Sequence, residues 1–234
     1  MITESLDYLR ESDDALKTVL IGGVLLIFSW LLLPLFLVLG YVVRVVRRTA
    51  AGNEEAPVFE DWEDLLVTGA KAFVIQFAYG FVPAVLAVVF VGFGVLGAAS
   101  GGRGGAALGG VLAVVGVLLA FVLGLLAAYL TPAAIANFAE RGVLGAGFAV
   151  DDLRPVWTSA AYARAWLMGA AVVVAAGIVG SLLGLVPVLG QVLVAFVTFY
   201  ALVAAYYIIG RAWGDLGEIE TREGDGSPEE RPAV

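Results

Sequence analysis

The sequence contains no cysteine and no histidine among its 234 residues. The absence of cysteine excludes disulfides and thiolate metal sites, and the absence of histidine removes the commonest general base and metal ligand. Lysine is scarce as well, because Lys17 and Lys71 are the only lysines among the 13 basic residues. With a formal net charge of −8, the sequence gives no support to nucleic-acid binding.

Charge is also missing from long stretches of the chain. Charged residues make up 15% of the sequence, hydrophobic residues make up 61%, and residues 18–43, 72–102, 104–139 and 165–210 carry no charge at all. A helix needs about 20 apolar residues to cross a hydrocarbon core of about 30 Å, and each of these runs is longer. None alternates polar and apolar positions as the strands of a membrane barrel do. The sequence therefore predicts an all-α integral membrane protein.

The apolar runs and the helix breakers between them predict one transmembrane domain, residues 18–210, with five spanning helices. The predicted spans are residues 18–43, 70–96, 106–130, 165–186 and 190–210. Pro34 and Pro83 are expected to kink the first two spans, and Pro132 to end the third. The acidic residues 1–17 form an N-terminal interfacial segment, and the acidic residues 211–234 form a tail that we expect to be disordered.

Amphipathic stretches predict helices that lie in the membrane interface beside this bundle. Residues 58–73 place apolar side chains at spacings of three and four, with Phe59 and Trp62 as aromatic anchors. Trp157 lies in the polar stretch between the third and fourth spans, and Trp166 lies at the start of the fourth. Such aromatic residues are typical of the belt at the level of the lipid head groups.

The distribution of basic residues predicts the orientation of the chain in the cell membrane. Five spans place Arg44, Arg47, Arg48 and all arginines after residue 140 on one side, and Arg10 and Arg103 on the other. The positive-inside rule makes the first side cytoplasmic, so the C-terminus is expected inside and the N-terminus outside. An acidic N-terminal segment must then cross the membrane. A re-entrant first segment, with both termini inside, is the alternative.

A faint internal repeat relates two parts of the chain. Each copy has a proline in an apolar helix, an arginine about ten residues later, a phenylalanine, and an Asp-Leu pair before the next span. The matching positions are Pro34, Arg44, Phe59 and Asp64-Leu65 in one copy and Pro132, Arg141, Phe148 and Asp152-Leu153 in the other. The spacings differ between the copies, so chance similarity is the alternative. A true repeat would be a parallel one.

A family resemblance is carried by the segment GYVVRVVRRTAAGNEEAPVFEDWEDLLVTGAK, residues 40–71, joined to TVLIGG at residues 18–23. These residues resemble the polytopic membrane family catalogued as domain of unknown function 4013, and F-x-D-W-x-D-L at residues 59–65 is the most specific part. The resemblance covers most of the chain up to the acidic tail. It implies an archaeal-type membrane protein, and it implies no activity and no functional residues.

No residue pattern points to catalysis, a cofactor or a metal. The acidic residues lie in loops, interfaces or the tail, so the paired intramembrane carboxylates of an aspartyl protease are missing, and a Ser-His pair lacks its base. The acids of residues 60–64 and the pair Asp151-Asp152 could hold a divalent ion, but such acids more often cap helices and solvate an interface. We therefore expect a chain that is not an enzyme and binds no cofactor or metal.

Small residues at a spacing of four are the strongest packing signal, because they allow membrane helices to approach closely. They predict tight helix contacts along the third and fourth spans, at Gly116, Ala120, Gly124, Ala128, Ala176, Gly180 and Gly184.

Two functions remain open at this stage. The first is a structural, assembly or partner-binding role in the lipid bilayer, with another membrane protein or a second copy as partner. The second is a permease for a neutral small solute or a lipid, with Gln76 and Gln191 lining the path. Proton coupling is disfavoured because the span cores contain no ionisable residue.

The many acids in loops and termini predict a salt-adapted source, since high salt screens their repulsion, and ordinary acidic loops are the alternative.

Overall fold

Most of the residues that the computed structural model describes, which are 1–10, 12, 14–99 and 102–225, are helical, and these residues contain no strand. The helices are α1 (Ile2–Arg10), α2 (Ala15–Ile27), α3 (Leu32–Ala50), α4 (Trp62–Ala99), α5 (Arg103–Arg141), the 3-10 helix η1 (Leu144–Phe148), α6 (Val150–Thr158), α7 (Ala160–Leu183) and α8 (Leu189–Asp225). The prediction of an all-α protein is confirmed.

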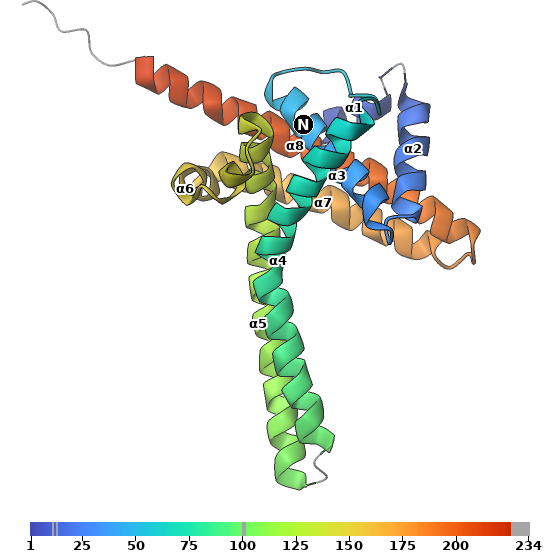
Figure 1. Ribbon diagram of the computed structural model, residues 1–234, viewed down its shortest axis with the longest axis vertical. Coiled ribbons are helices and arrows are strands. Elements are labelled where there is room, and N and C mark those ends of the chain that lie inside the picture. Colours follow the sequence, from blue (N-terminus) through green and yellow to red (C-terminus); the bar gives the residue numbers. More distant parts are fainter. Residues whose placement is uncertain (11, 13, 100–101, 226–234) are drawn as a thin grey trace, which may run out of the picture.

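Four helices of the described chain, α4, α5, α7 and α8, are long and apolar enough to cross a membrane. They pair as two hairpins, α4 with α5 and α7 with α8. With 38 residues, α4 is about 57 Å long. Figure 1 shows the α4–α5 hairpin projecting from the rest of the molecule, while the α7–α8 hairpin leaves in another direction. The class predicted from the sequence is thus confirmed, with four long apolar helices in place of five.

Three helix segments meet where the two hairpins join, and they form the core of the molecule, which we call the hub. They are α3, the last part of α5 and the middle of α8, and the fully buried side chains include Tyr41, Phe138 and Phe199. The helix α4 crosses α3 at very close range, because a Cβ atom on Gly69 would overlap the backbone carbonyl of Phe36.

The first predicted span is two helices rather than one. The helix α2 ends at Ile27, α3 begins at Leu32, and the turn between them leaves Trp30 76% exposed. Figure 1 shows α3 returning toward the end of the molecule from which α2 starts. Pro34 lies in the first turn of α3, where its missing N–H needs no helical partner, so it kinks nothing. Residues 18–43 therefore form two helices joined by a turn, which is the arrangement that the alternative, a re-entrant first segment, requires.

The helix α1 packs on the hub beside the loop of residues 51–61. The Tyr8 hydroxyl donates to the backbone carbonyl of Glu55 at 3.2 Å, and the ring centroids of Tyr8 and Tyr207 are 4.5 Å apart. The Tyr200 hydroxyl donates to the carbonyl of Leu6. The N-terminal segment and the loop after α3 thus share one end of the molecule, whereas a crossing first span would have separated them.

Several predicted boundaries shift because helices continue through local breakers. The stretch 58–73 is not a separate interfacial helix, since α4 begins at Trp62 and runs without interruption past Pro83. The helix α5 continues through Pro132 to Arg141. The helix α8 continues to Asp225, so residues 211–225 of the predicted disordered tail are helical, and residues 226–234 lie outside the described residues.

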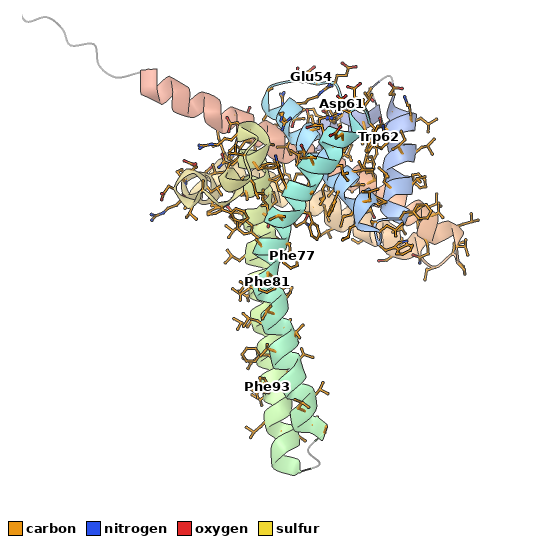
Figure 2. All side chains as sticks on the ribbon, viewed as in Figure 1. Glu54, Asp61, Trp62, Phe77, Phe81 and Phe93 are labelled. Atoms are coloured by element: carbon orange, nitrogen blue, oxygen red, sulfur yellow. The ribbon has the colours of Figure 1, made fainter. Side chains whose placement is uncertain are left out.

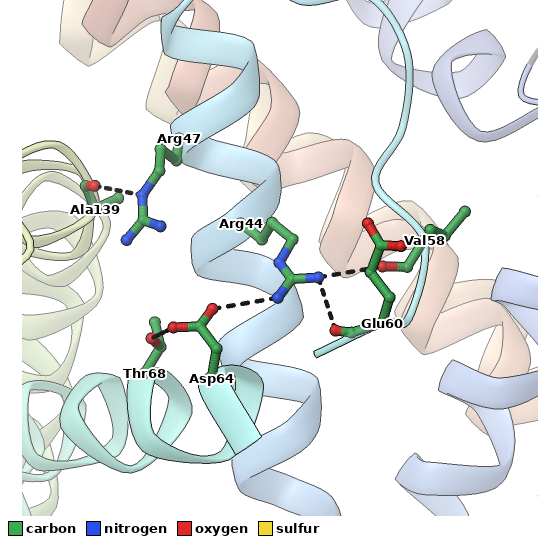
Figure 3. A network of polar contacts seen from close by, with 7 residues as sticks. All are labelled: Arg44, Arg47, Val58, Glu60, Asp64, Thr68 and Ala139. Carbon is green, nitrogen blue, oxygen red and sulfur yellow. Dashed lines mark hydrogen bonds and ion pairs between the residues drawn. The ribbon is translucent and has the colours of Figure 1, made fainter. Parts of the chain in front are cut away.

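The two copies of the internal repeat have matching contacts. Arg44 of α3 pairs with Asp64 in the first turn of α4 at 3.2 Å (Figure 3), and Arg141 of α5 pairs with Asp152 in the first turn of α6 at 3.0 Å. The leucine that follows each aspartate is fully buried. In both copies an Arg–Asp ion pair, which we call the Arg–Asp clasp, therefore joins one α-helix to the next α-helix along the chain. This match supports the repeat over chance similarity.

Candidate functional site

A proline inside α5 marks the candidate site. Pro132 has no N–H, so the carbonyl of Ala128, four residues earlier, lacks its helical donor. The indole Nε1 of Trp166, on α7, donates to this carbonyl at 2.8 Å. A side chain from a neighbouring helix therefore supplies the hydrogen bond that the proline removes.

Tyr162 bridges the same turn of α5 one residue further along. Its hydroxyl donates to the carbonyl of Tyr129 at 2.6 Å and accepts the N–H of Ala133 at 3.2 Å. In a regular helix these two backbone groups would bond to each other. The side chain of Tyr162 is buried, and its own N–H is fixed by the hydroxyl of Ser159, the N-cap of α7, at 3.2 Å. The start of α7 thus holds the Tyr162 hydroxyl in place.

Trp157 of α6 completes the set of aromatic donors. Its Nε1 donates to the carbonyl of Leu130 at 3.3 Å, and its own carbonyl accepts the hydroxyl of Tyr129 at 2.8 Å. The Tyr129 ring meets the rings of Tyr162 and Trp166 edge-on, with centroids 5.2 and 5.4 Å apart. Three successive carbonyls of α5 thus bond to three aromatic side chains, which explains why the helix continues through a proline.

A groove with a volume of about 510 Å³ lies between α4 and α5 beside this break. Small residues form most of its wall, namely Gly80, Ala84, Ala87, Ala120, Gly124, Ala127 and Ala128. Gln76, Thr131 and Tyr206 contribute the polar groups, and no charged residue lines it. The Thr131 hydroxyl donates to the carbonyl of Ala127 at 2.6 Å, so it is already satisfied within α5. The groove is therefore suited to an uncharged, largely apolar occupant.

The small-residue stripe of α5 is only partly a packing face. Gly116 is covered by Phe90 of α4, as predicted. A Cβ atom on Gly124, in contrast, would meet nothing within 4 Å, and Ala120 and Ala128 line the open groove. The tight helix contact expected at Gly124 is therefore not made within this chain. Four-residue spacing places small residues on one face, but the separation of α4 and α5 decides which of them are covered.

A close backbone contact of the α4–α5 hairpin lies nearer its tip. A Cβ atom on Gly109 would lie 2.6 Å from the carbonyl oxygen of Gly94 and 3.0 Å from the Cα of Gly97. Gly105 and Gly109 form a G-x-x-x-G pair, which is the sequence signal for this contact. On α7, a Cβ atom on Gly180 would make only ordinary contact with Val194, at 3.6 Å. Gly184 follows the end of the helix, and Ala176 lines a separate cavity.

The predicted aromatic anchors have different roles in the structure. Phe59 is 7% exposed and stacks on Tyr41 with ring centroids 4.3 Å apart, so it belongs to the core and not to the interface. Trp62 is 47% exposed at the start of α4, as an anchor would be. Trp157 and Trp166 turn their indole N–H groups to α5, a role that single-sequence patterns do not reveal.

The two glutamines predicted to line one path lie on different hairpins. Gln76 lines the groove between α4 and α5. Gln191 lies in the first turn of α8, where its amide nitrogen is near Gly184 at the tip of the α7–α8 hairpin. Only Gln76 is therefore part of the candidate site.

Charged side chains gather at the end of the molecule opposite the tip of the α4–α5 hairpin. In Figure 2, Glu54 and Asp61 lie at this end, while Phe77, Phe81 and Phe93 follow the hairpin. Arg44 holds the loop there: its Nη1 donates to the Glu60 carbonyl at 2.9 Å, besides the bond to Asp64 (Figure 3). Within the described residues, no three Asp or Glu side chains are grouped closely enough to hold a metal ion.

The comparisons with known proteins identify the family. The family model described as "Protein of unknown function (DUF4013)" matches residues 25–185, more than half of the chain. The chain belongs to the DUF4013 family. No curated protein and no solved structure matches it. The DUF4013 match ends at Leu185, so it includes Pro132, Tyr162 and Trp166 and stops before α8.

Proposed function

We propose that this DUF4013 protein is a non-catalytic membrane protein with an assembly role, and that the groove between α4 and α5 receives a transmembrane helix of a partner or of a second copy. The observation that carries the proposal is the open space at Gly124 in a groove walled by small residues of both helices. Helices associate in lipid where small residues allow close backbone approach, because lipid solvates large apolar side chains as well as a protein does.

The surroundings of the groove support a lateral partner. Only 6% of the most apolar stretch of α4, and 6% of that of α5, is buried within this chain. Phe77, Phe81 and Phe93 are each at least half exposed along the hairpin (Figure 2). The groove carries no charge, so a helix could enter it from the bilayer without desolvating an ion.

The arrangement of the polar segments supports four crossings of the cell membrane with both termini in the cytoplasm. The segment 1–10, the loop 51–61 and the stretch 142–159 belong to one end, where Arg10, Arg44 and Arg141 also lie, whereas Arg103 begins α5 at the other. The positive-inside rule makes the arginine-rich end cytoplasmic. Because the two hairpins diverge, both cross only if they tilt, and the length of α4 allows this.

The acidic cytoplasmic end supports a salt-adapted, archaeal-type source. Glu54, Glu55, Glu60, Asp61 and Glu63 crowd into the loop before α4 and its first turn. At high ionic strength the Debye length falls to about 3 Å, which screens this repulsion.

A second candidate function is favoured by the polar groups of the same groove. Gln76, Thr131 and Tyr206 offer hydrogen-bonding groups in an otherwise apolar wall, as a permease for a neutral solute or a lipid would require. Transport would proceed without proton coupling, because no ionisable carboxylate or amine lines the groove.

Site-specific photo-crosslinking in native membranes separates the two functions. A crosslinker at Gly124 should give one discrete protein adduct, and mass spectrometry of the adduct tells a second copy from another protein. Gly110 is the control, since a Cβ atom at this exposed glycine of α5 would also meet nothing within 4 Å, but Gly110 does not line the groove. Equal adducts from both positions, or adducts with lipid alone, would contradict the assembly role. A saturable flux in proteoliposomes that Gln76→Ala abolishes would favour the permease.

A further inference from the structure

A second cavity, remote from the α4–α5 groove, lies between α1, α2, α7 and α8. Its volume is about 550 Å³, and its walls are almost entirely apolar. Leu6 of α1, Val19 of α2, Ala171 and Ala175 of α7, and Phe196 of α8 contribute to the lining. The alanines of α7 leave the space open where larger side chains would have filled it.

An apolar space of this size is not left empty in a membrane. The cavity is open at the molecular surface, because Ile2, Leu6, Ala171 and Ala175 of its lining are exposed. Water is a poor occupant, because it needs two to four polar partners and the walls offer almost none. In a bilayer the abundant guest of matching chemistry is the hydrocarbon chain of a lipid. The volume also lies in the usual range of ligand pockets, about 300–1,000 Å³.

One face of α1 leads from this cavity to a positive charge. Ile2 and Leu6 line the cavity, and Arg10 is the next residue at a spacing of four, so it continues the same helical face. The guanidinium of Arg10 is 75% exposed and its pair with Asp7 is long, at 3.7 Å. The Tyr200 hydroxyl, which also lines the cavity, ties α1 in place through the carbonyl of Leu6. The helix α1 therefore forms one wall of the cavity, and its Arg10 places a cation one helical turn beyond Leu6.

We propose that this cavity binds one hydrocarbon chain of a membrane phospholipid, with the lipid phosphate at Arg10. The hydrocarbon chain of the lipid fills the space between α1 and the α7–α8 hairpin and packs against both. The phosphate shares Arg10 with Asp7, so Arg10 sets a preference among lipids, and the apolar walls supply most of the binding. The proposal is independent of any partner in the α4–α5 groove.

The test uses the purified full-length chain in detergent, with phosphatidylglycerol or the uncharged diacylglycerol of the same acyl chains added, and counts bound lipid by native mass spectrometry. The parent should retain one phosphatidylglycerol. Ala175→Phe fills the cavity from an exposed position of α7 and should reduce the retained lipid by at least about tenfold, a difference that native mass spectrometry resolves readily. Arg10→Gln should abolish the preference for phosphatidylglycerol over diacylglycerol.

Val174→Phe is the control, because Val174 is 61% exposed on α7 and does not line the cavity. Equal lipid loss from Val174→Phe and Ala175→Phe would show only non-specific surface lipid and overturn the proposal, as would a parent that retains none. An unchanged lipid preference in Arg10→Gln would overturn the assignment of the phosphate to Arg10.

Discussion

Trp166 donates its indole N–H to the carbonyl oxygen of Ala128, the one backbone acceptor of α5 that Pro132 deprives of a helical donor. The two residues lie on different helices and are 38 positions apart in the sequence. The proline and the tryptophan are therefore a matched pair: one creates an unsatisfied carbonyl in an apolar helix, and the other satisfies it.

This pairing predicts a measurable coupling between positions 132 and 166. Trp166→Phe should lower the free energy of unfolding by about 1–3 kcal/mol, since it leaves the Ala128 carbonyl without a donor. In a Pro132→Ala background the restored N–H can bond that carbonyl, so the same substitution should cost less. Unfolding in mixed detergent micelles gives the double-mutant cycle. Equal costs in both backgrounds would mean that the tryptophan stabilises only by packing.

The glycines of α5 should differ sharply in their tolerance of a large side chain. Gly109→Leu should destabilise the chain by about 1–3 kcal/mol, because the leucine would overlap the backbone of Gly94 and Gly97. Gly124→Leu should change stability by less than about 0.5 kcal/mol, because it points into an open groove. Thermal stability of the monodisperse species in detergent is the measurement. The reverse order would show that the two helices approach each other at Gly124 instead.

The two Arg–Asp clasps of the repeat should contribute unequally. The Arg44 side chain is 13% exposed and bonds two loop carbonyls besides Asp64, whereas Arg141 is 50% exposed. We expect Arg44→Ala to cost about 1–3 kcal/mol and Arg141→Ala less than about 1 kcal/mol, because exposed ion pairs are screened. Limited proteolysis of the loop 51–61 provides a local readout. Cleavage there should accelerate only in the Arg44 variant.

The docking of α1 should weaken in strong alkali. Burial raises the pKa of Tyr8 above its ordinary value of 10.0. Because the pKa of Tyr8 is higher in the folded state than in the unfolded state, burying its neutral hydroxyl stabilises the folded state fully at a pH below about 10. This stabilisation is lost as the pH rises from about 10 toward the pKa of the folded state. A spin label on Thr3→Cys, the only cysteine in the chain, should gain mobility above pH 10. A phenylalanine at position 8 cannot ionise, so Tyr8→Phe should weaken this transition, at the cost of the hydrogen bond to Glu55 at every pH.

The membrane topology can be tested with single cysteines in this cysteine-free chain. Thr3→Cys and Asn53→Cys should react with an impermeant maleimide from the same side of the membrane, and Gly102→Cys from the other. Labelling of positions 3 and 53 from opposite sides would show instead that the first apolar segment crosses the membrane.

The residues of the candidate site can be found in the sequence, but their contacts with one another cannot. Pro132 is visible as a breaker, and Trp157 and Trp166 as membrane-typical aromatics, but nothing in their spacing connects them. A hydrogen bond between α5 and α7 depends on how two helices dock, which local periodicity does not encode. Gly124 has the same limitation, because the stripe fixes its face and the neighbouring helix fixes whether that face is covered.

The sequence by itself determined the class of this protein. Hydrocarbon forces every backbone polar group to bond internally, so uncharged runs of this length must be helices, and the family follows from residues 25–185. Only the tertiary structure decided that residues 18–43 turn back at Trp30, that α5 passes through Pro132, and that Gly109 rather than Gly124 is enclosed. These outcomes depend on donors and surfaces from distant helices, and the composition of a single segment cannot specify them.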